Sequence, residues 1–244
     1  MAEHAFTAAT GAAGTDKASS RGMPRVLPAV LIALTVFAGF IDAASYLGLS
    51  RVFVANMTGN VIFVGFGLGG VHTIDLAASL VALGAFLAGA AGGGRLALRL
   101  ATRGSRWLAG SIGTQTLCVA AAAVALATGV AHVHGPSRFV VVALLAAAMG
   151  LQNALARRLN VADLTTTVLT QTLTRLAIES RIAGGHGAGT GRRLTAVAAM
   201  LGGALVGAVF VLGAGLTPAL FAGAAFLGVV AVISWAVPQA GDAA

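Results

Sequence analysis

The 244-residue sequence has a single cysteine, Cys118, which excludes an intramolecular disulfide and a thiolate metal cage. Charged residues make up only 9% of the chain, whereas a water-soluble globular domain carries roughly a quarter. The seven acidic residues and five histidines are scattered along the chain and offer little material for hydrolytic or metal chemistry. These shortages exclude a soluble globular protein, and we expect no enzymatic activity, no metal site and no cofactor.

Apolar residues dominate the chain instead. They make up 58% of it, with 34 glycines and a mean hydropathy of +0.93. Six stretches have the ~20 helical residues needed to cross a ~30 Å hydrocarbon core; they are residues 27–49, 74–94, 107–129, 139–156, 194–215 and 218–237. The sequence therefore predicts an all-α integral membrane protein whose partner is the lipid bilayer. Residues 1–26 are predicted to be a disordered cytoplasmic tail and residues 238–244 a short C-terminal tail.

Two further stretches, 52–69 and 163–180, are interrupted by polar residues, and basic charge decides how we place them. If both crossed the membrane, seven basic residues would lie on each side. If both enter and return, only Arg51 and Arg138 lie outside and thirteen basic residues lie inside. Because lysine and arginine gather in the cytoplasm, we expect about six spans, two re-entrant or broken segments and both termini inside a bacterial inner membrane. The net charge of +8 then reports orientation, and we expect no nucleic-acid partner.

Weak internal matches recur in the same order in the two halves of the chain. They pair Asp42 with Asn153, Thr58 with Thr170, and residues 83–90 with residues 201–208. The separations grow from 111 to 112 to 118 positions, as loop insertions would produce. Chance matching within an Ala-, Gly-, Leu- and Val-rich background is the alternative explanation.

With six spans, the span containing Asp42 and the span containing Asn153 run in opposite directions. We therefore expect a 3+3 inverted repeat, with residues 27–130 and 139–237 as its halves. In such a repeat the two re-entrant segments approach the middle of the bilayer from opposite sides, which is where transporters place their sites.

Asp42 is the one deep carboxylate that the sequence places within a span. An isolated aspartate there costs ~2.5–3.5 kcal/mol on insertion scales, so it should face protein or water. Gly39, Asp42, Ala43 and Tyr46 share one helical face. Asp42 fits a proton or cation site and, equally, a structural acceptor for the backbone N–H groups of the neighbouring re-entrant segment.

Thr58, Gly59 and Asn60 combine a hydroxyl, a flexible hinge and an amide in apolar surroundings. Short polar side chains beside glycine can satisfy the backbone of a re-entrant turn, which is the structural interpretation. In the functional interpretation a half-helix begins near Asn56, and its N-terminal N–H groups attract an anionic or strongly polar solute. Thr170 belongs to a threonine-rich ladder in the second half, where hydroxyls more often bond their own helix.

Small residues spaced four apart recur in the spans: Gly84 with Ala88 and Gly92, Gly89 with Gly93, and Gly203 with Gly207. We expect them to serve helix packing within one chain.

Four segments carry a resemblance to a known family: residues 39–48 (GFIDAASYLG), 52–61 (VFVANMTGNV), 150–154 (GLQNA) and 165–170 (TTTVLT). They resemble the YoaK-like bacterial membrane proteins, a family of unknown function described as having about six transmembrane helices. The resemblance covers nearly everything after the tail, with MTGN as its most specific part. It implies an inner-membrane protein and supplies neither a substrate nor a catalytic residue.

The sequence as a whole favours a small-solute transporter or channel-like facilitator with its site between two repeats near the bilayer midplane. The predicted pathway residues are Asp42, Asn56, Thr58, Gly59, Asn60, Gln152, Asn153 and Thr170. The expected partner is a small polar solute of unknown identity, and a homo-oligomer is left open. The alternative is a membrane accessory or scaffold protein in which the polar motifs only stabilise broken helices.

Overall fold

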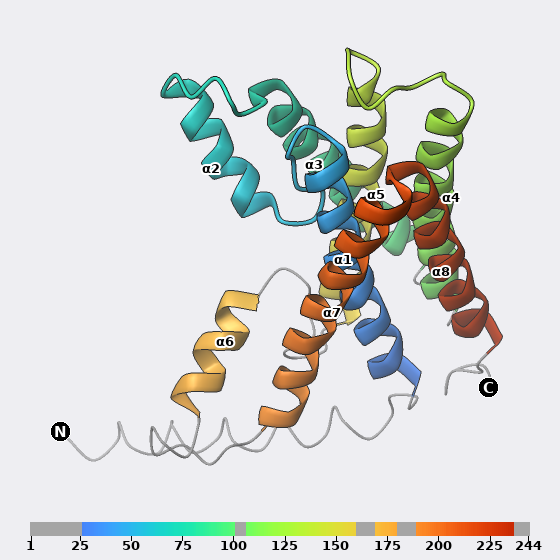
Figure 1. Cartoon of the computed structure of the whole chain (residues 1–244). Coiled ribbons are helices and arrows are strands. Elements are labelled where there is room, and N and C mark those ends of the chain that lie inside the picture. The colour runs from blue at the N-terminus through green and yellow to red at the C-terminus, as the bar shows by residue number, and fades with distance from the viewer. Residues whose placement is uncertain (1–25, 101–105, 160–168, 180–188, 237–244) are drawn as a thin grey trace.

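The computed structural model of the protein describes residues 26–100, 106–159, 169–179 and 189–236, and in this part the chain forms eight helices (Figure 1). They are α1 (Val26–Gly48), α2 (Met57–Leu68), α3 (Leu76–Leu100), α4 (Arg106–Ala127), α5 (Arg138–Leu159), α6 (Leu169–Ile178), α7 (Thr190–Ala214) and α8 (Leu216–Ala236). Six of them, all except α2 and α6, are long and apolar enough to cross a membrane. The prediction of an all-α membrane protein with six spans is confirmed. The predicted tails and the first part of the stretch 163–180 lie outside the described residues.

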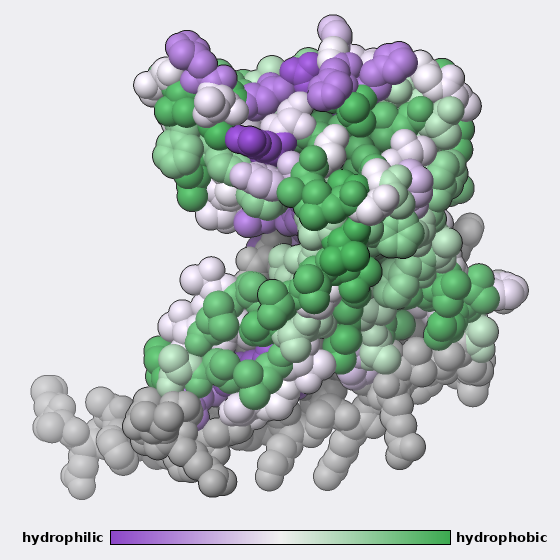
Figure 2. Space-filling view, in the orientation of Figure 1, coloured by the Kyte–Doolittle hydropathy of each residue, from purple (hydrophilic) through white to green (hydrophobic). Residues whose placement is uncertain are grey.

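The helices α1 and α5 form the centre of the bundle. In the most apolar part of each of these two helices, 67% is buried inside the protein. The corresponding share is 22% for α3 and α7, which face outward. The helix α1 packs along α7, and α5 packs along α3; α4 lies against both α5 and α8, and α8 also contacts α1. Figure 2 shows hydrophobic side chains over the middle of the molecule and hydrophilic ones gathered at its upper end. This surface suits a protein whose middle contacts lipid.

Glycines allow the two outer helices to approach the central ones closely. A Cβ atom at Gly203 of α7 would collide with the carbonyl oxygen of Val36 in α1, and a Cβ at Gly89 of α3 would collide with that of Ala147 in α5. Without a side chain, backbone meets backbone across both seams, which gives the dense van der Waals packing that holds membrane helices together. The prediction of intramolecular packing is confirmed at these positions.

The prediction is wrong for Gly84 and Gly92, because a Cβ atom at either would meet no atom within 4 Å. Both point away from the α3–α5 seam, since they lie on a different face of α3 from Gly89 and Gly93. Spacing alone identifies a stripe of small residues, whereas the direction in which that stripe faces depends on the neighbouring helix.

The helix α2, and α6 as far as the structure describes it, are too short to cross the bilayer. At ~1.5 Å per residue, their 12 and 10 residues span about 18 and 15 Å of a ~30 Å core. The helix α2 packs against α3 in the upper part of the molecule, and α6 packs against α7 in the lower part (Figure 1). The segment 49–56 leaves the end of α1, turns back along it and then leads into α2, so residues 52–68 form a re-entrant segment.

Candidate functional site

Asp42 anchors the part of the first re-entrant segment that precedes α2. We call this part, residues 52–56, the descending arm. The Oδ1 atom of Asp42 accepts hydrogen bonds from the backbone N–H groups of Val54 at 2.9 Å and Ala55 at 2.7 Å. The N–H of Asn56 also interacts with the carboxylate, and Asp42 is 5% exposed. Consecutive N–H groups aimed at one anion form an anion-binding nest. Since this arm has no helical partners for these donors, the carboxylate supplies the acceptor that the hydrocarbon core cannot.

Asn60 fixes the same arm from the side of α2. Its Oδ1 atom accepts from the backbone N–H of Phe53 at 3.1 Å, and its Nδ2 atom donates to the carbonyl oxygen of Phe53 at 2.6 Å. One fully buried side chain thereby satisfies both backbone groups of one residue. An amide can do this because it carries a donor and an acceptor side by side.

Aromatic rings close the outer side of this turn. The ring of Phe53 stacks on Tyr46 of α1, with 4.9 Å between centroids, and on Phe63 of α2, with 5.7 Å. A Cβ atom at Gly59 would lie 2.7 Å from the Phe53 ring, which explains why glycine occupies that position. Asp42, Asn60 and the ring stack together define the path of the re-entrant segment.

The predicted residues Asn56 and Thr58 lie differently, because both are exposed. Asn56 precedes the first turn of α2, and its side chain makes no capping hydrogen bond there. The N-terminus of a helix carries partial positive charge on N–H groups that lack helical partners. In the second half Thr170 is also exposed, in the first turn of α6. Figure 2 shows the surface hollowed between the part formed by α2 and the part formed by α6.

Two polar residues that the sequence matches in the second half are also buried. Asn153, the match of Asp42, is 5% exposed, and its Nδ2 atom donates to the carbonyl oxygen of Met149 at 3.0 Å. Thr172 is 4% exposed and follows Thr170 by two positions, as Asn60 follows Thr58. The residues that would correspond to the arm held by Asp42 lie outside the described ranges.

Gln152 belongs to a separate polar contact in the core. Its Nε2 atom donates to the carbonyl oxygen of Leu34 at 3.0 Å, and its Oε1 atom accepts from Nε2 of Gln115. The Leu34 carbonyl can only accept, so the Gln152 atom that faces it must be the donor Nε2. Oε1 of Gln152 then faces Gln115, which must present its own Nε2 as the donor, so both amide orientations are fixed. Leu34 lies eight residues, about 12 Å along the helix, before Asp42. This contact ties α4 and α5 to α1 and is distinct from the re-entrant site.

Gln115 was missed by sequence reasoning. Its only signal is an amide within the apolar run 107–129. Its Oε1 atom is buried and finds no hydrogen-bond donor among the described residues. Such an atom costs about 1–3 kcal/mol in an apolar interior.

We predict that the two glutamines depend on each other. Gln152→Leu should destabilise the protein by about 1–3 kcal/mol because it leaves the buried Nε2 of Gln115 without its main acceptor. The double variant Gln115→Leu, Gln152→Leu should return to within about 1 kcal/mol of the wild type, since both polar groups are then gone. Unfolding in detergent measures the double-mutant cycle. Additive losses would contradict the coupling.

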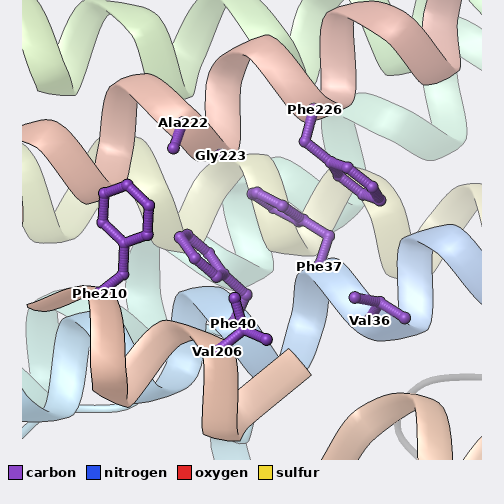
Figure 3. A pocket seen from close by; sticks show the side chains of 8 residues that line it. All are labelled: Val36, Phe37, Phe40, Val206, Phe210, Ala222, Gly223 and Phe226. Atoms are coloured by element: carbon purple, nitrogen blue, oxygen red, sulfur yellow. The ribbon is translucent and has the colours of Figure 1, made fainter. Parts of the chain in front are cut away.

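A second hollow lies between α1, α7 and α8, with a volume of about 250 Å³ (Figure 3). Its lining is Val36, Phe37, Phe40, Val206, Phe210, Ala222, Gly223 and Phe226. The labelled side chains carry only carbon, so this hollow suits hydrocarbon and offers nothing to a polar solute. Within the described ranges, no three His, Cys, Asp or Glu side chains come close enough to hold a metal ion.

The bundle of six apolar helices agrees with the comparisons with known proteins. The profile of a family described as "Protein of unknown function (DUF1275)" matches residues 30–233. The chain belongs to this family. It is also 31% identical over 153 residues to the "UPF0700 transmembrane protein YoaK" of Bacillus subtilis (strain 168). The match covers 60% of this chain and 64% of the relative, so it spans somewhat less than two thirds of the relative's length. No solved structure matches the chain.

These findings confirm the YoaK-like resemblance and establish a multi-pass membrane protein of an uncharacterised family. Of the predicted residues, the structure brings Asp42 of α1 together with Gly59 and Asn60 of the re-entrant segment, whereas Asn56 and Thr58 lie on the exposed side of that segment. Asn153 is buried in α5. The structure places Gln152 in the separate core contact and Thr170 on the other short helix. The structure thereby separates residues that hold the segment from residues that face outward.

Proposed function

We propose that the protein is a small-solute transporter or channel-like facilitator whose site lies near the bilayer midplane, between two inverted repeats. The observation that carries this proposal is the pair of short helices α2 and α6, which lie at opposite halves of the bundle (Figure 1). Broken helices at membrane depth are tolerated only where protein or a polar cavity covers them, and transporters place their sites at such breaks.

Helix packing supports the repeat. The contact of α1 with α7 corresponds to that of α5 with α3, and the contact of α2 with α3 corresponds to that of α6 with α7. The helices α3 and α7 both have 25 residues, and α1 and α5 have 23 and 22. In Figure 1, α1, α4 and α7 run upward, whereas α5, α8 and α3 run downward, which is the opposite direction for each matched pair.

Glycine contacts give this correspondence residue by residue. Gly203 and Gly89 are 114 positions apart, while the residues whose carbonyl groups they face, Val36 and Ala147, are 111 apart. A second pair of contacts, Gly207 with Phe40 and Gly93 with Leu151, shows the same two separations: the glycines are 114 positions apart and their partners 111. The contacts therefore favour a separation of 114 for the third span of each repeat, in place of the 118 that the sequence match used. This agreement between contacts supports a repeat over chance similarity in an apolar background.

The chemistry at the hollow is polar and suited to hydrogen bonding. Exposed hydroxyl groups of Thr58 and Thr170 stand in the first turns of α2 and α6, where helix N-termini add partial positive charge. Asp42 acts in this proposal as the anchor of the segment, because two backbone donors occupy its Oδ1 atom. The sequence has no ATP-binding motif, so a gradient of the solute itself would drive movement.

We predict that Thr58→Val and Thr170→Val each slow solute flux about tenfold, as expected for one lost hydrogen bond of ~1–1.5 kcal/mol in the pathway. Valine keeps the size and removes the hydroxyl. The matched control is Thr174→Val on α6, whose hydroxyl is exposed and bonds the carbonyl of Thr170 in its own helix. Swelling of proteoliposomes in a panel of small polyols, amides, amino acids and organic acids measures the flux. Swelling no faster than that of empty liposomes, for every solute, would refute the transport proposal.

A scaffold role is the second candidate, and one observation favours it. Asp42 and Asn60 both have protein partners for their hydrogen bonds, so the re-entrant segment is held without any solute. If folded wild-type protein moves no solute of the panel faster than empty liposomes do, this candidate replaces the first.

We also propose an inner-membrane location with both termini in the cytoplasm. Arg99 in the last turn of α3, Arg157 and Arg158 in the last turn of α5 and Arg192 in the first turn of α7 lie at the end of the bundle where α1 begins. The excess of arginine at that end supports a cytoplasmic placement. Labelling of a cysteine at position 99 from the outside, in a variant without Cys118, would overturn this orientation.

A further inference from the structure

A polar pocket opens at the opposite end of the bundle, where α1 ends and α3 begins. We call it the rim pocket; it has a volume of about 390 Å³ and is lined by Ser50, Arg51, His72, Thr73, Ile74 and Asp75. It adjoins the start of the re-entrant segment, since Val52 follows Arg51 directly. In Figure 2 hydrophilic side chains gather at this end of the molecule.

The one acidic residue of the rim pocket is already neutralised. Oδ2 of Asp75 accepts from Nη2 of Arg138 at 2.7 Å and from Nε at 3.1 Å, and Oδ1 accepts from the backbone N–H of Ala78 at 3.0 Å. Partial burial disfavours the charged carboxylate, but these hydrogen bonds and the guanidinium charge together hold the pKa of Asp75 below its usual value. Asp75 therefore stays ionised with its charge balanced, and the pocket keeps the charge of Arg51.

Arg51 has no such partner. Its side chain is exposed, and in the described part of the chain it makes no hydrogen bond or ion pair. Arginine is disfavoured at this end of a membrane protein when the opposite end is cytoplasmic. Arg138, the other arginine there, pairs with Asp75, whereas no residue within the described ranges pairs with Arg51.

The backbone at this position is also strained. Ser50 and Arg51 have φ angles of 48° and 54°, so two consecutive residues other than glycine adopt the left-handed conformation. This conformation costs free energy in residues with a Cβ atom, and such strain gathers at functional sites. Glycine adopts this conformation without that cost, so an arginine at this position points to a use for its guanidinium group.

We propose that the rim pocket binds a small oxyanion, a phosphate or carboxylate group, with Arg51 as its principal ligand. The guanidinium group offers two parallel N–H donors that match an oxyanion, and the His72 ring and Thr73 hydroxyl lie in the same lining as further hydrogen-bonding groups. The oxyanion comes either from solution or from the headgroup of a membrane lipid. This binding site does not depend on the proposed transport function.

The test uses the full chain in an uncharged detergent, titrated with inorganic phosphate at constant ionic strength, with chloride as the balancing anion. We expect phosphate to raise the unfolding temperature of the wild type, and Arg51→Gln to weaken the apparent affinity at least tenfold. Arg99→Gln, an exposed arginine at the other end, is the matched control and should keep the wild-type affinity. Equal affinities for wild type and Arg51→Gln would overturn the proposal.

A second titration, with short-chain phosphatidylglycerol against short-chain phosphatidylcholine, distinguishes the two sources. Binding of phosphatidylglycerol alone, again dependent on Arg51, assigns the pocket to an anionic lipid; binding of free phosphate assigns it to a dissolved anion. Response to neither ligand would overturn the site. Arg51→Gly adds a stability readout, because it should unfold at a higher temperature than the wild type without ligand and yet fail to bind.

Discussion

Asp42→Ala is expected to produce one of the largest losses of stability in this protein. The substitution removes the acceptor of the backbone N–H groups of Val54 and Ala55, two buried residues that precede α2. Each buried donor left without an acceptor costs about 1–3 kcal/mol, so the expected loss is about 2–6 kcal/mol. The free energy of unfolding, measured in detergent micelles, tests this prediction.

Asp42→Asn separates the hydrogen bonds from the charge. The amide retains an oxygen that accepts from the same two donors, so the loss should be roughly half of that for Asp42→Ala. Thr35→Ala is the matched control on α1, because this buried hydroxyl bonds only the Leu31 carbonyl of its own helix. If Asp42→Ala cost no more than Thr35→Ala, the anchoring role would be wrong.

Asp42→Asn also distinguishes an anchor from a proton-coupling residue. An anchor predicts that the flux through folded Asp42→Asn protein keeps the pH dependence of the wild type, since asparagine preserves the hydrogen-bond geometry. Loss of that pH dependence in stable protein would restore the proton-site hypothesis for Asp42.

Gly203→Ala is expected to open the seam between α1 and α7. The added methyl group would collide with the carbonyl oxygen of Val36. Because this oxygen belongs to the backbone and cannot rotate away, the two helices must separate. Forcing extra atoms into a packed interface costs about 1–3 kcal/mol, and the cost should lie at or above the upper end here. Thermal or chemical unfolding of the purified variant measures it.

The neighbouring Gly202 provides the control. A Cβ atom there would meet nothing within 4 Å, so Gly202→Ala should be neutral or should stabilise the helix by up to about 1 kcal/mol. The two substitutions are chemically identical, adjacent and opposite in expected sign. Equal effects would show that the α1–α7 seam is less close than the structure has it.

The same pair of substitutions in the first half tests the proposed repeat. Gly89 corresponds to Gly203 and faces Ala147 as Gly203 faces Val36. Gly89→Ala should therefore resemble Gly203→Ala in its cost, whereas Gly84→Ala, with open space around it, should resemble Gly202→Ala.

The sequence predicts a part of the site wherever a residue type has one physical requirement inside a membrane. A carboxylate within an apolar span needs a partner, and the sequence named Asp42 and the segment that would supply donors. The sequence does not distinguish a structural acceptor from a proton site at Asp42, because both require the same carboxylate in the same apolar run. The hydrogen bonds to Val54 and Ala55 favour the structural acceptor.

Other residues could not be placed from the sequence because their roles depend on a neighbour distant in the chain. Gln152 was grouped with the polar segment, yet its amide bonds Leu34 and Gln115 in the core. Gln115 went unnoticed, since one amide in an apolar run carries no period or spacing. Gly59 was identified as a hinge, whereas the Phe53 ring against it supplies a steric reason.

The sequence by itself determined the class of the protein, its six spans and the stretches that break the pattern, because hydrophobic length and charge scarcity act locally along the chain. Only the tertiary structure decided that α2 ends short of crossing, which glycines form the seams, and that Arg51 has no ion-pair partner among the described residues, whereas Arg138 has one. Those properties depend on which helix faces which, and in a bilayer that choice is made by close packing and hydrogen bonding between segments. Because the hydropathy of such a helix is similar on every side, the sequence pattern does not predict which side faces a given neighbour.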